Sequence, residues 1–302
     1  MLQPALLCAL RAIAEPTRLR LLVICRAGEL TVGEITRILG QSQPRVSRHL
    51  KLLCDAGLLE RFREGHWVFY RLPTRGRGGA VAHAVLDLLS PDDETARLDR
   101  QRMSDVMSER ARLASDSLGM PGGEASVPDA RIDAAITRAF GGTALGELLD
   151  IGTGSGRILR LLADRAEQAT GVDISSEMLM IARTNLHAAG LQHCTVRRGN
   201  MYKLPFGNGS FDTITIDQVL SQAEQPALVL AEAARLLRPG GSLLVVDFDG
   251  GGNPVDPEDV AAWVDAVGLD CTRIEHVEAQ SDAPPAVLLL AHKAHNADDV
   301  AA

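Results

Sequence analysis

The sequence predicts an α/β chain with two folded parts: a small α+β head, and a larger domain built on a doubly wound parallel sheet. Residues 1–78 hold 13 Lys and Arg against 6 Asp and Glu, whereas the rest of the chain holds 18 against 33. The basic part shows three helical patterns followed by two strands, and the acidic part repeats units of strand, turn and helix. A basic head on an acidic body is typical of proteins whose head binds nucleic acid.

Bulk composition sets the class of protein. The 302 residues are 46% hydrophobic, which is enough to fill the cores of two domains. The apolar run Ala286–Ala291 is far shorter than the ~18 residues needed to span a bilayer, and "PALLCAL" near the N-terminus has no basic region before it. The five cysteines form no C-x-x-C pair. We therefore expect a cytoplasmic protein with free thiols, no bound metal and no membrane partner.

The head begins with two helical patterns. "PTRLRLLVICRAG" predicts a buried helix ending at Gly28, and "LTVGEITRILG" predicts a second helix stopped by Gly40. In the following stretch, "QSQPRVSRHLKLLCDAG", Ser42 is a natural N-cap. Val46, Leu50 and Leu53 recur at helical spacing, so they share one buried face.

The other faces of this third helix are polar and basic. A helix, a tight turn and a second helix form the geometry that inserts the second helix into the major groove of DNA. Arg, Gln and Ser can contact base edges there, and Lys suits phosphate. The residues expected to contact DNA from this helix are Gln43, Arg45, Ser47, Arg48, His49 and Lys51.

After Gly57 the pattern changes to period two, in "LLERFREGHWVFYRL", which predicts a β-hairpin turning at Glu64–Gly65. Arg61, Arg63 and Arg71 would make this hairpin a basic wing that contacts phosphate or the minor groove. The alternative is a small helical domain with a solvated basic face. The hairpin directly after the basic helix and the excess of positive charge favour DNA binding by residues 1–73.

Three stretches of the head, "EPTRLRLL", "LTVGEI" and "SQPRVSRHLKLLCDAGLLERFREGHWVFYRL", resemble the winged helix-turn-helix of the ArsR family of bacterial repressors. The resemblance implies a homodimer on palindromic double-stranded operator DNA. Many members of that family sense metal through two cysteines on the helix that here reads "ELTVGEI". Thr31 and Gly33 stand at those places, and neither is a metal ligand, so we expect no metal sensing there.

Residues 74–130 are expected to connect the two parts through linkers and dimerisation helices. Thr74–Gly79 is expected to be a flexible joint, and Ala80–Leu89 suits a helix at a dimer interface. A long helix is expected to follow, with Ser90 as its N-cap and Leu118 near its end. Its apolar stripe can pack either on a partner copy or on its own chain; the stripe consists of Met103, Val106, Met107, Ala111, Ala114 and Leu118. Gly119–Asp129 is expected to be a linker.

The acidic part, residues 131–293, opens with "ALGELLDIGTGSGRILRLLADRA", a strand, a glycine loop and a helix. Asp150 ends the strand, and the glycines are spaced Gly152-x-Gly154-x-Gly156. A carboxylate at this place would repel a pyrophosphate on the helix N-terminus, which argues against a dinucleotide. It suits a cationic group instead, such as the ammonium of S-adenosylmethionine (SAM), a ligand without phosphate.

Further strands follow in the same pattern. The second ends in Asp173, whose carboxylate can accept both hydroxyls of a ribose, and Ile174 would flank the adenine. Asn200–Met201 follow the third strand, and Thr213–Ile216 is the fourth. "GGSLLVVDF" is a fifth strand, and Cys271–Val277 and Ala286–His292 are two more. Parallel strands of this kind hold ligands at their carboxyl ends. Residues 294–302 are expected to be a flexible tail.

The motifs "LDIGTGSG", "GVDIS", "GNMYKLPF", "FDTITIDQVL" and "LLRPGGSLLVVD" resemble the class I SAM-dependent methyltransferases, whose domain is Rossmann-like. The resemblance implies that the loop glycines, Asp173 and Asn200–Met201 hold SAM or its product S-adenosylhomocysteine, and we place Asp217 in the same set. The whole chain resembles the fusion of an ArsR-type head to a methyltransferase-type body.

This sequence departs from such relatives in several places. They usually carry an aspartate at the position of Asn200, where it reads the adenine amino group, and histidines at Asp217 and Ser221. Two segments that shape the acceptor pocket look short: only "GMPGGEASVP" precedes the first strand, and "DFDGGGNPVDPED" follows the fifth. Asp217, Asp247 and Asp249 are candidate general bases, but each is as readily a strand-end acid.

Two functions remain open from the sequence. One is a transcriptional regulator whose body binds SAM or S-adenosylhomocysteine and modulates operator binding by the head. The other is an active methyltransferase, acting on a small molecule or a protein, that carries a DNA-binding head. A retained SAM cradle with a reduced acceptor pocket favours the regulator, because methyl transfer requires the acceptor to be held in line with the sulfonium methyl.

Overall fold

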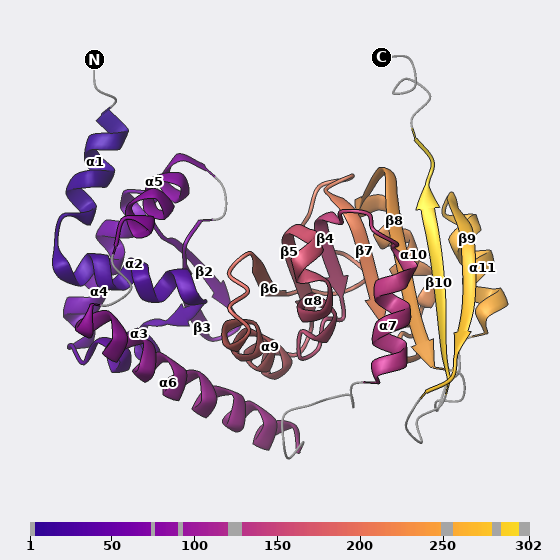
Figure 1. Ribbon diagram of the computed structural model, residues 1–302, viewed down its shortest axis with the longest axis horizontal. Coiled ribbons are helices and arrows are strands. Elements are labelled where there is room, and N and C mark those ends of the chain that lie inside the picture. The colour runs from indigo at the N-terminus through magenta and orange to yellow at the C-terminus, as the bar shows by residue number, and fades with distance from the viewer. Residues whose placement is uncertain are drawn as a thin grey trace. The chain divides into compact units, whose positions relative to one another are not determined.

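The computed structural model describes residues 4–73, 76–89, 93–119, 129–248, 256–279 and 285–295. The chain forms two compact units, and Figure 1 colours the ribbon by residue number. The first unit comprises residues 1–119 with 187–192, and the second comprises residues 120–186 with 193–302. We call the first unit the head and the second the body. No helix within the described ranges is long and apolar enough to span a bilayer.

Four helices build the predicted helix-turn-helix: α1 (Pro4–Ile13), α2 (Pro16–Ala27), α3 (Val32–Leu39) and α4 (Gln43–Asp55). A capping box starts α3, in which Thr31 and Glu34 each accept the other's backbone N–H. Gly40 ends α3 with φ at 64°, which makes the tight turn into α4 possible. Val46, Leu50 and Leu53 are fully buried, which confirms the predicted inner face of α4.

The predicted hairpin is confirmed as β2 (Glu60–Glu64) and β3 (Trp67–Arg71). A two-residue strand, β1 (Leu30–Thr31), pairs with β3, so the small sheet has the order β1-β3-β2. Phe62 and Phe69 lie opposite each other in the register and stack with 5.6 Å between ring centroids. This stacked face packs on the head and completes a winged helix-turn-helix.

The glycine run after the wing is partly helical. α5 spans Gly76–Asp87, so the expectation of a flexible joint is wrong for Gly76–Gly79, while Thr74 and Arg75 lie outside the described residues. A Cβ on Gly78 would lie 1.9 Å from the carbonyl oxygen of Gly57, and one on Gly79 would lie 2.4 Å from that of Pro73. These glycines therefore allow α5 to pack directly on the backbone of the head.

The long helix is α6 (Glu94–Leu118). Its N-cap is Asp93, whose side chain accepts the backbone N–H of Ala96 at 2.8 Å, rather than Ser90, which lies outside the described residues. Met103, Val106 and Met107 are buried in the core of the head, and Ala114 is buried as well. These four residues of the stripe therefore pack on their own chain.

Ion pairs hold α6 on the head. Arg20 of α2 donates two hydrogen bonds, of 2.7 and 2.8 Å, to the carboxylate of Asp99, which is 1% exposed. Arg110 pairs with Glu34, the residue that closes the capping box of α3. These contacts join α6 to α2 and α3, so α6 belongs to the structure that supports the winged helix-turn-helix.

The body is built on one seven-stranded sheet with the order β6-β5-β4-β7-β8-β10-β9. The strands from β6 to β8 are parallel, as predicted, whereas β10 runs antiparallel to both of its neighbours. The last strand therefore reverses the sheet in a way that the strand–helix repeat did not predict. The strands are β4 (Gly146–Ile151), β5 (Ala166–Asp173), β6 (Cys194–Arg198), β7 (Phe211–Asp217), β8 (Leu237–Phe248), β9 (Leu269–Val277) and β10 (Ala286–Lys293).

Helices cover both faces of this sheet (Figure 1). Leu149, Ile214 and Val229 are fully buried in a hydrophobic core that joins the sheet to α10 and α11. The helices are α7 (Ala130–Ala139), α8 (Arg157–Leu162), α9 (Ser176–Ala188), α10 (Pro226–Leu236) and α11 (Pro257–Ala266), with short 3-10 helices at Ala163–Arg165 and Leu220–Gln222.

The helix α7 corrects one expectation. The sequence predicted only a linker before the first strand, but a ten-residue helix lies there. Asp129 caps this helix, because its side chain accepts the backbone N–H groups of Arg131 and Ile132. The segment before β4 therefore contains a helix, which the sequence did not predict.

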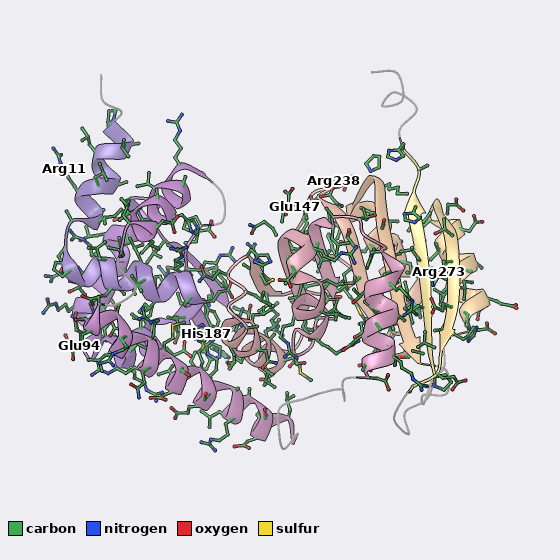
Figure 2. All side chains as sticks on the ribbon, viewed as in Figure 1. Arg11, Glu94, Glu147, His187, Arg238 and Arg273 are labelled. Carbon is green, nitrogen blue, oxygen red and sulfur yellow. The ribbon has the colours of Figure 1, made fainter. Side chains whose placement is uncertain are left out.

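The two ends of the parallel strands differ. At the end where β4 begins, the carboxylate of Asp212 accepts the backbone N–H of Glu147 at 2.8 Å and a guanidinium N–H of Arg238 at 2.5 Å. Figure 2 shows Glu147 and Arg238 close together at this end of the sheet. The predicted ligand residues lie at the opposite end, where the parallel strands finish.

Candidate ligand-binding and nucleic-acid-binding sites

The glycine loop, Gly152–Gly156, lies between β4 and α8. Gly152, Gly154 and Gly156 all have φ between 51° and 78°, the left-handed region that favours glycine. A Cβ on Gly152 would also lie 2.1 Å from a methyl carbon of Val219, so no other residue fits there without displacement. The loop is fixed to the next strand, because the N–H groups of Gly152 and Thr153 both donate to the carbonyl of Val172, at 2.8 and 2.9 Å.

Asp173 ends β5 beside this loop. One carboxylate oxygen accepts the N–H of Gly154 at 2.9 Å, and the other accepts the N–H of Ser175 at 2.8 Å. Each oxygen keeps a lone pair for a second donor. The structure thus places a half-buried carboxylate, with fixed orientation and spare acceptor capacity, where the sequence predicted the ribose contact.

Ile174 and Asn200 follow neighbouring strands. Ile174 is 63% exposed, which is unusual for isoleucine and leaves an apolar surface at the end of β5. The N–H of Gly199 donates to the carbonyl of Asp173 at 2.9 Å, and Arg198 donates to the carbonyl of Ile174 at 3.0 Å. These bonds tie the two strand ends together. Met201 is half-buried and packs against the main core.

Asp150 is less accessible than the sequence suggested. Its side chain is 1% exposed and lies within the sheet, where one oxygen accepts the hydroxyl of Thr215 at 2.8 Å. The other oxygen has no hydrogen-bond partner. Burial raises the pKa of Asp150 from 3.8 to about 7. The carboxylate is therefore held below the loop and is close to half-protonated at neutral pH.

Arg157, the first residue of α8, was not singled out from the sequence. Its guanidinium donates to Asp217 at the end of β7, with 2.7 Å between Nη2 and Oδ2, and to Asp133 of α7. A cation at the first position of a helix is opposed by the helix dipole, so it requires acidic partners. That unfavourable placement, directly after the glycine loop, is the signal that could have identified it.

Unpaired buried polar atoms gather at this end of the sheet. The described chain has eight buried side-chain nitrogen or oxygen atoms without a hydrogen-bond partner, and four of them belong to this site. Buried polar groups are normally satisfied, so this concentration makes the site a candidate for binding a polar ligand. The four atoms are Oδ2 of Asp150, Oγ1 of Thr153, Nε of Arg157 and Oδ1 of Asp217.

The donors and acceptors of this site fit an amino-acid group. Carboxylate oxygens of Asp150 and Asp217 suit an ammonium, and a guanidinium N–H of Arg157 suits a carboxylate. We call Asp133, Asp150, Arg157 and Asp217 the charged cluster. Within the described ranges, no group of three or more His, Cys, Asp and Glu side chains is arranged to hold a metal ion.

The candidate general bases are engaged in other contacts. Asp217 pairs with Arg157, and Asp247, 8% exposed, accepts the backbone N–H of Ser221 at 3.1 Å. Asp249 lies outside the described residues. Both described carboxylates therefore have structural contacts, and Oδ1 of Asp217 remains without a hydrogen-bond partner.

The face of α4 opposite its buried residues is open to solvent. Five of the six residues predicted to contact DNA from this helix are exposed: Gln43, Arg45, Ser47, Arg48 and Lys51. His49 differs, because its side chain is 14% exposed and its Nδ1 lies 3.7 Å from the carboxylate of Glu15. The imidazole therefore lies toward the start of α2.

The wing presents two of its three predicted arginines. Arg61 and Arg63 are exposed, and Arg63 donates to the carbonyl of Gly65 at 3.0 Å. Arg71 is 6% exposed, lies 4.9 Å from the ring centroid of Phe62, and pairs with Glu29 and Glu60. The expectation that Arg71 contacts DNA is therefore wrong. The register explains this, because Arg71 is opposite Glu60, on the hairpin face that packs inward.

Comparison with known proteins agrees with this division. Residues 15–61 match the family model of bacterial regulatory proteins of the arsR family, and residues 149–245 match that of the methyltransferase domain. The arsenic resistance transcriptional regulator ArsR1 of Pseudomonas putida is 51% identical over 63 residues, which cover 20% of this chain and 49% of that protein. The demethylmenaquinone methyltransferase of Tropheryma whipplei is 39% identical over 120 residues, covering 40% of this chain and 49% of that protein.

The chain thus spans about half the length of these curated relatives. The crystal structure of the [4+2]-cyclase SpnF superposes with a TM-score of 0.51 at 20% identity, covering 65% of this chain and 96% of SpnF, which supports the fold of the body alone. Both predicted resemblances are confirmed. The chain joins an ArsR-type winged helix-turn-helix head to a class I methyltransferase-type domain with a mostly parallel sheet.

Proposed function

We propose that this protein is a transcriptional regulator whose head binds operator DNA as a homodimer and whose body binds SAM or S-adenosylhomocysteine to modulate that binding. The observation that carries the proposal is the charged cluster beside the glycine loop, which offers unpaired buried atoms to a ligand. The described candidate bases are meanwhile held in ion pairs or backbone hydrogen bonds. Charged groups that can hold a ligand, in a site whose described candidate bases already have structural contacts, suit sensing.

DNA binding is supported by the exposed residues of α4 and the wing. Arg45 and Arg48 project from α4 and can donate to base edges, while Lys51 and Arg61 suit phosphates. Because phosphate contacts release counterions, the affinity for DNA falls as salt rises. The net charge of residues 1–78 gives this head a favourable long-range attraction to DNA.

A homodimer is supported by an exposed apolar surface on α1 and α5, which contact each other. Leu88, after the end of α5, is 85% exposed, and the neighbouring Leu89 is 38% exposed. α1 contributes Leu6, Leu7 and Leu10, each between 37% and 43% exposed. Exposed leucines on α1 and directly after α5 are typical of a surface that another copy covers. A dimer would also match the two-fold symmetry of a palindromic operator.

The proposed ligand contacts follow from the chemistry of each group. Arg157 would bind the amino-acid carboxylate of SAM, and Asp150 and Asp217 its ammonium. Asp173 would accept the ribose hydroxyls, and the exposed Ile174, with Asn200 and Met201, would border the adenine. When bound, SAM supplies an electrophilic methyl group, whereas S-adenosylhomocysteine supplies none, so a response to both ligands would indicate sensing.

A route for coupling follows from two sets of ion pairs. Asp99 and Arg110 fix α6 to the head, and Asp133 fixes α7 to Arg157 beside the glycine loop. In sequence, only residues 119–129 separate α6 from α7. A ligand carboxylate that competes for Arg157 would weaken its hold on Asp133 and so change the position of α7. Coupling requires that the ligand prefers one of the two states, typically by roughly 1–3 kcal/mol.

The methyltransferase-domain match favours a second candidate, an active SAM-dependent methyltransferase that acts on a small molecule or a protein. Incubation with SAM labelled on the methyl group and with fractionated cell extract separates the two functions. Catalytic release of S-adenosylhomocysteine with any fraction would support the enzyme and contradict a pure sensor.

Reciprocity of binding tests the regulator directly. S-adenosylhomocysteine is titrated calorimetrically into the protein, alone and in the presence of operator DNA. Coupling requires that DNA changes the ligand's affinity by the same factor by which the ligand changes DNA affinity. The Asp173→Ala variant, which removes the proposed ribose acceptor, should lose ligand binding and keep DNA binding. Equal ligand affinities with and without DNA would contradict the proposal.

A further inference from the structure

The amide of Asn200 has a fixed orientation. Its side-chain oxygen accepts the backbone N–H of Tyr202 at 3.0 Å, and its own carbonyl accepts the N–H of Lys203 at 2.9 Å. These two bonds close a turn at the end of β6, and Asn200 and Lys203 also form an isolated β-bridge. Because only the oxygen can accept the N–H of Tyr202, the other branch of the amide is an NH₂ donor.

Asn200 follows the strand next to the one that Ile174 follows. The hydrogen bonds from Gly199 to Asp173 and from Arg198 to Ile174 fix the end of β6 to the end of β5. Ile174, 63% exposed, and Asn200, also exposed, therefore follow the carboxyl ends of two adjacent strands. A planar base lying against Ile174 would present its polar edge to Asn200, an arrangement that rests on the proposed function.

The two common purine edges differ in sign at position 6. Adenine carries an amino group there, which donates hydrogen bonds, whereas a 6-oxopurine carries a carbonyl, which accepts them. An NH₂ group facing the adenine amino group places two donors opposite each other, which leaves the adenine amino group only the second lone pair of the oxygen that already accepts the Tyr202 N–H. Facing a 6-oxopurine, the same NH₂ group makes a hydrogen bond. A carboxylate at this position would have the opposite preference.

We propose that Asn200 sets the base specificity of the body, so that it binds a nucleoside thioether with a 6-oxopurine base at least as tightly as the adenine form. The side chain selects by donating to position 6, while the contacts to ribose and amino acid are common to both ligands. A site that hydrogen-bonds one edge rejects the mismatched edge because a polar group is left unpaired.

The test compares two ligands that differ only at the base, S-adenosylhomocysteine and S-inosylhomocysteine. Their dissociation constants are measured calorimetrically with the full chain and with Asn200→Asp, which keeps the oxygen that accepts the Tyr202 N–H. The ratio of the two constants removes any general change in affinity. We expect Asn200→Asp to shift this ratio at least about tenfold toward the adenine ligand, the usual effect of a hydrogen bond to a charged group.

Asn208→Asp is the matched control. It introduces the same charge at an exposed loop residue before β7, at the opposite end of the parallel strands. The side-chain oxygen at this position accepts a hydrogen bond from Arg235 in both the Asn and the Asp form. This control should leave the ratio unchanged. An equal ratio in the unmodified chain and Asn200→Asp, or tighter binding of S-adenosylhomocysteine than of S-inosylhomocysteine by the unmodified chain, would overturn the inference and leave the proposed function standing. If neither ligand binds either protein, the proposed function fails and this inference falls with it.

Discussion

Asp217, the last residue of β7, pairs with Arg157, the first residue of α8, with 2.7 Å between the two side chains, each of which is 12% exposed. Arg157 also pairs with Asp133 of α7. One guanidinium therefore holds together three segments that are far apart in the sequence. The glycine loop lies directly before Arg157, so this arrangement fixes the place where the ligand is proposed to bind.

Removal of this guanidinium should destabilise the body. Arg157→Met leaves the largely buried carboxylate of Asp217 and the half-buried carboxylate of Asp133 without their cation, and we expect a loss of about 3–5 kcal/mol in the free energy of unfolding. Urea denaturation followed by circular dichroism measures it. Arg160→Met, on an exposed position of the same helix, is the control and should change little. Equal stability of the two variants would show that the ion pairs contribute nothing.

The buried carboxylate of Asp150 should make stability depend on pH. Its pKa is raised from 3.8 to about 7, so between these values the folded chain keeps a proton that the unfolded chain releases. The stability contributed by this group is therefore fully present below about pH 4 and falls as pH rises toward 7, by about 1.4 kcal/mol per unit at most.

The measurement compares the chain with Asp150→Asn, which stays neutral at every pH. Urea denaturation at several values from pH 4.5 to 8 gives the difference in unfolding free energy between the two proteins. We expect this difference to shift in favour of Asp150→Asn as pH rises and to level off above about pH 7. A difference that does not change with pH would mean that Asp150 is ionised throughout the range.

The arginines of the wing should separate into two kinds. Arg61→Ala, at an exposed position, should weaken DNA binding for all sequences and reduce the salt slope by about 1, with no change in melting temperature. Arg71→Ala should instead lower the melting temperature, because it removes the ion pair with the buried carboxylate of Glu29. Fluorescence anisotropy at several salt concentrations and thermal unfolding measure the two effects. A salt slope reduced by Arg71→Ala without loss of stability would contradict this assignment.

Two glycines of the head should respond in opposite ways to the same change. Gly78→Ala places a Cβ 1.9 Å from the carbonyl oxygen of Gly57, so α5 must shift, and we expect a loss of about 1–3 kcal/mol. Gly33→Ala meets nothing within 4 Å and lies in α3, so it should stabilise the head by roughly 0.5–1 kcal/mol. Thermal unfolding of both variants compares them. A neutral Gly78→Ala would show that α5 is not seated on the backbone of Gly57.

The features that the sequence predicted are mostly local. The inner face of α4, the hairpin and the strand ends at Asp173 and Asn200 each follow from spacing or turn chemistry within a short stretch. The parallel direction of the strands from β4 to β8 follows from repeated strand–helix units. For these elements the physical cause lies within about fifteen residues of chain, so a single sequence is sufficient.

The features that it did not predict depend on distant contacts. Arg157 finds Asp133 and Asp217, 24 and 60 residues away, only after folding. Arg71 is buried because the hairpin register places it opposite Glu60, and the glycines in the first turn of α5 are needed for the approach to Gly57. The antiparallel direction of β10 shows only in its pairing with β8 and β9.

The central claim is that a ligand in the body changes the affinity of the head for DNA. The most direct measurement is fluorescence anisotropy of the purified full chain on DNA from upstream of its own gene, at one fixed salt concentration. Titrations are made without ligand, with SAM and with S-adenosylhomocysteine, and are repeated with Asp173→Ala. The account predicts that at least one ligand changes the apparent dissociation constant several-fold and that Asp173→Ala abolishes this change. Tight DNA binding that neither ligand alters would contradict it.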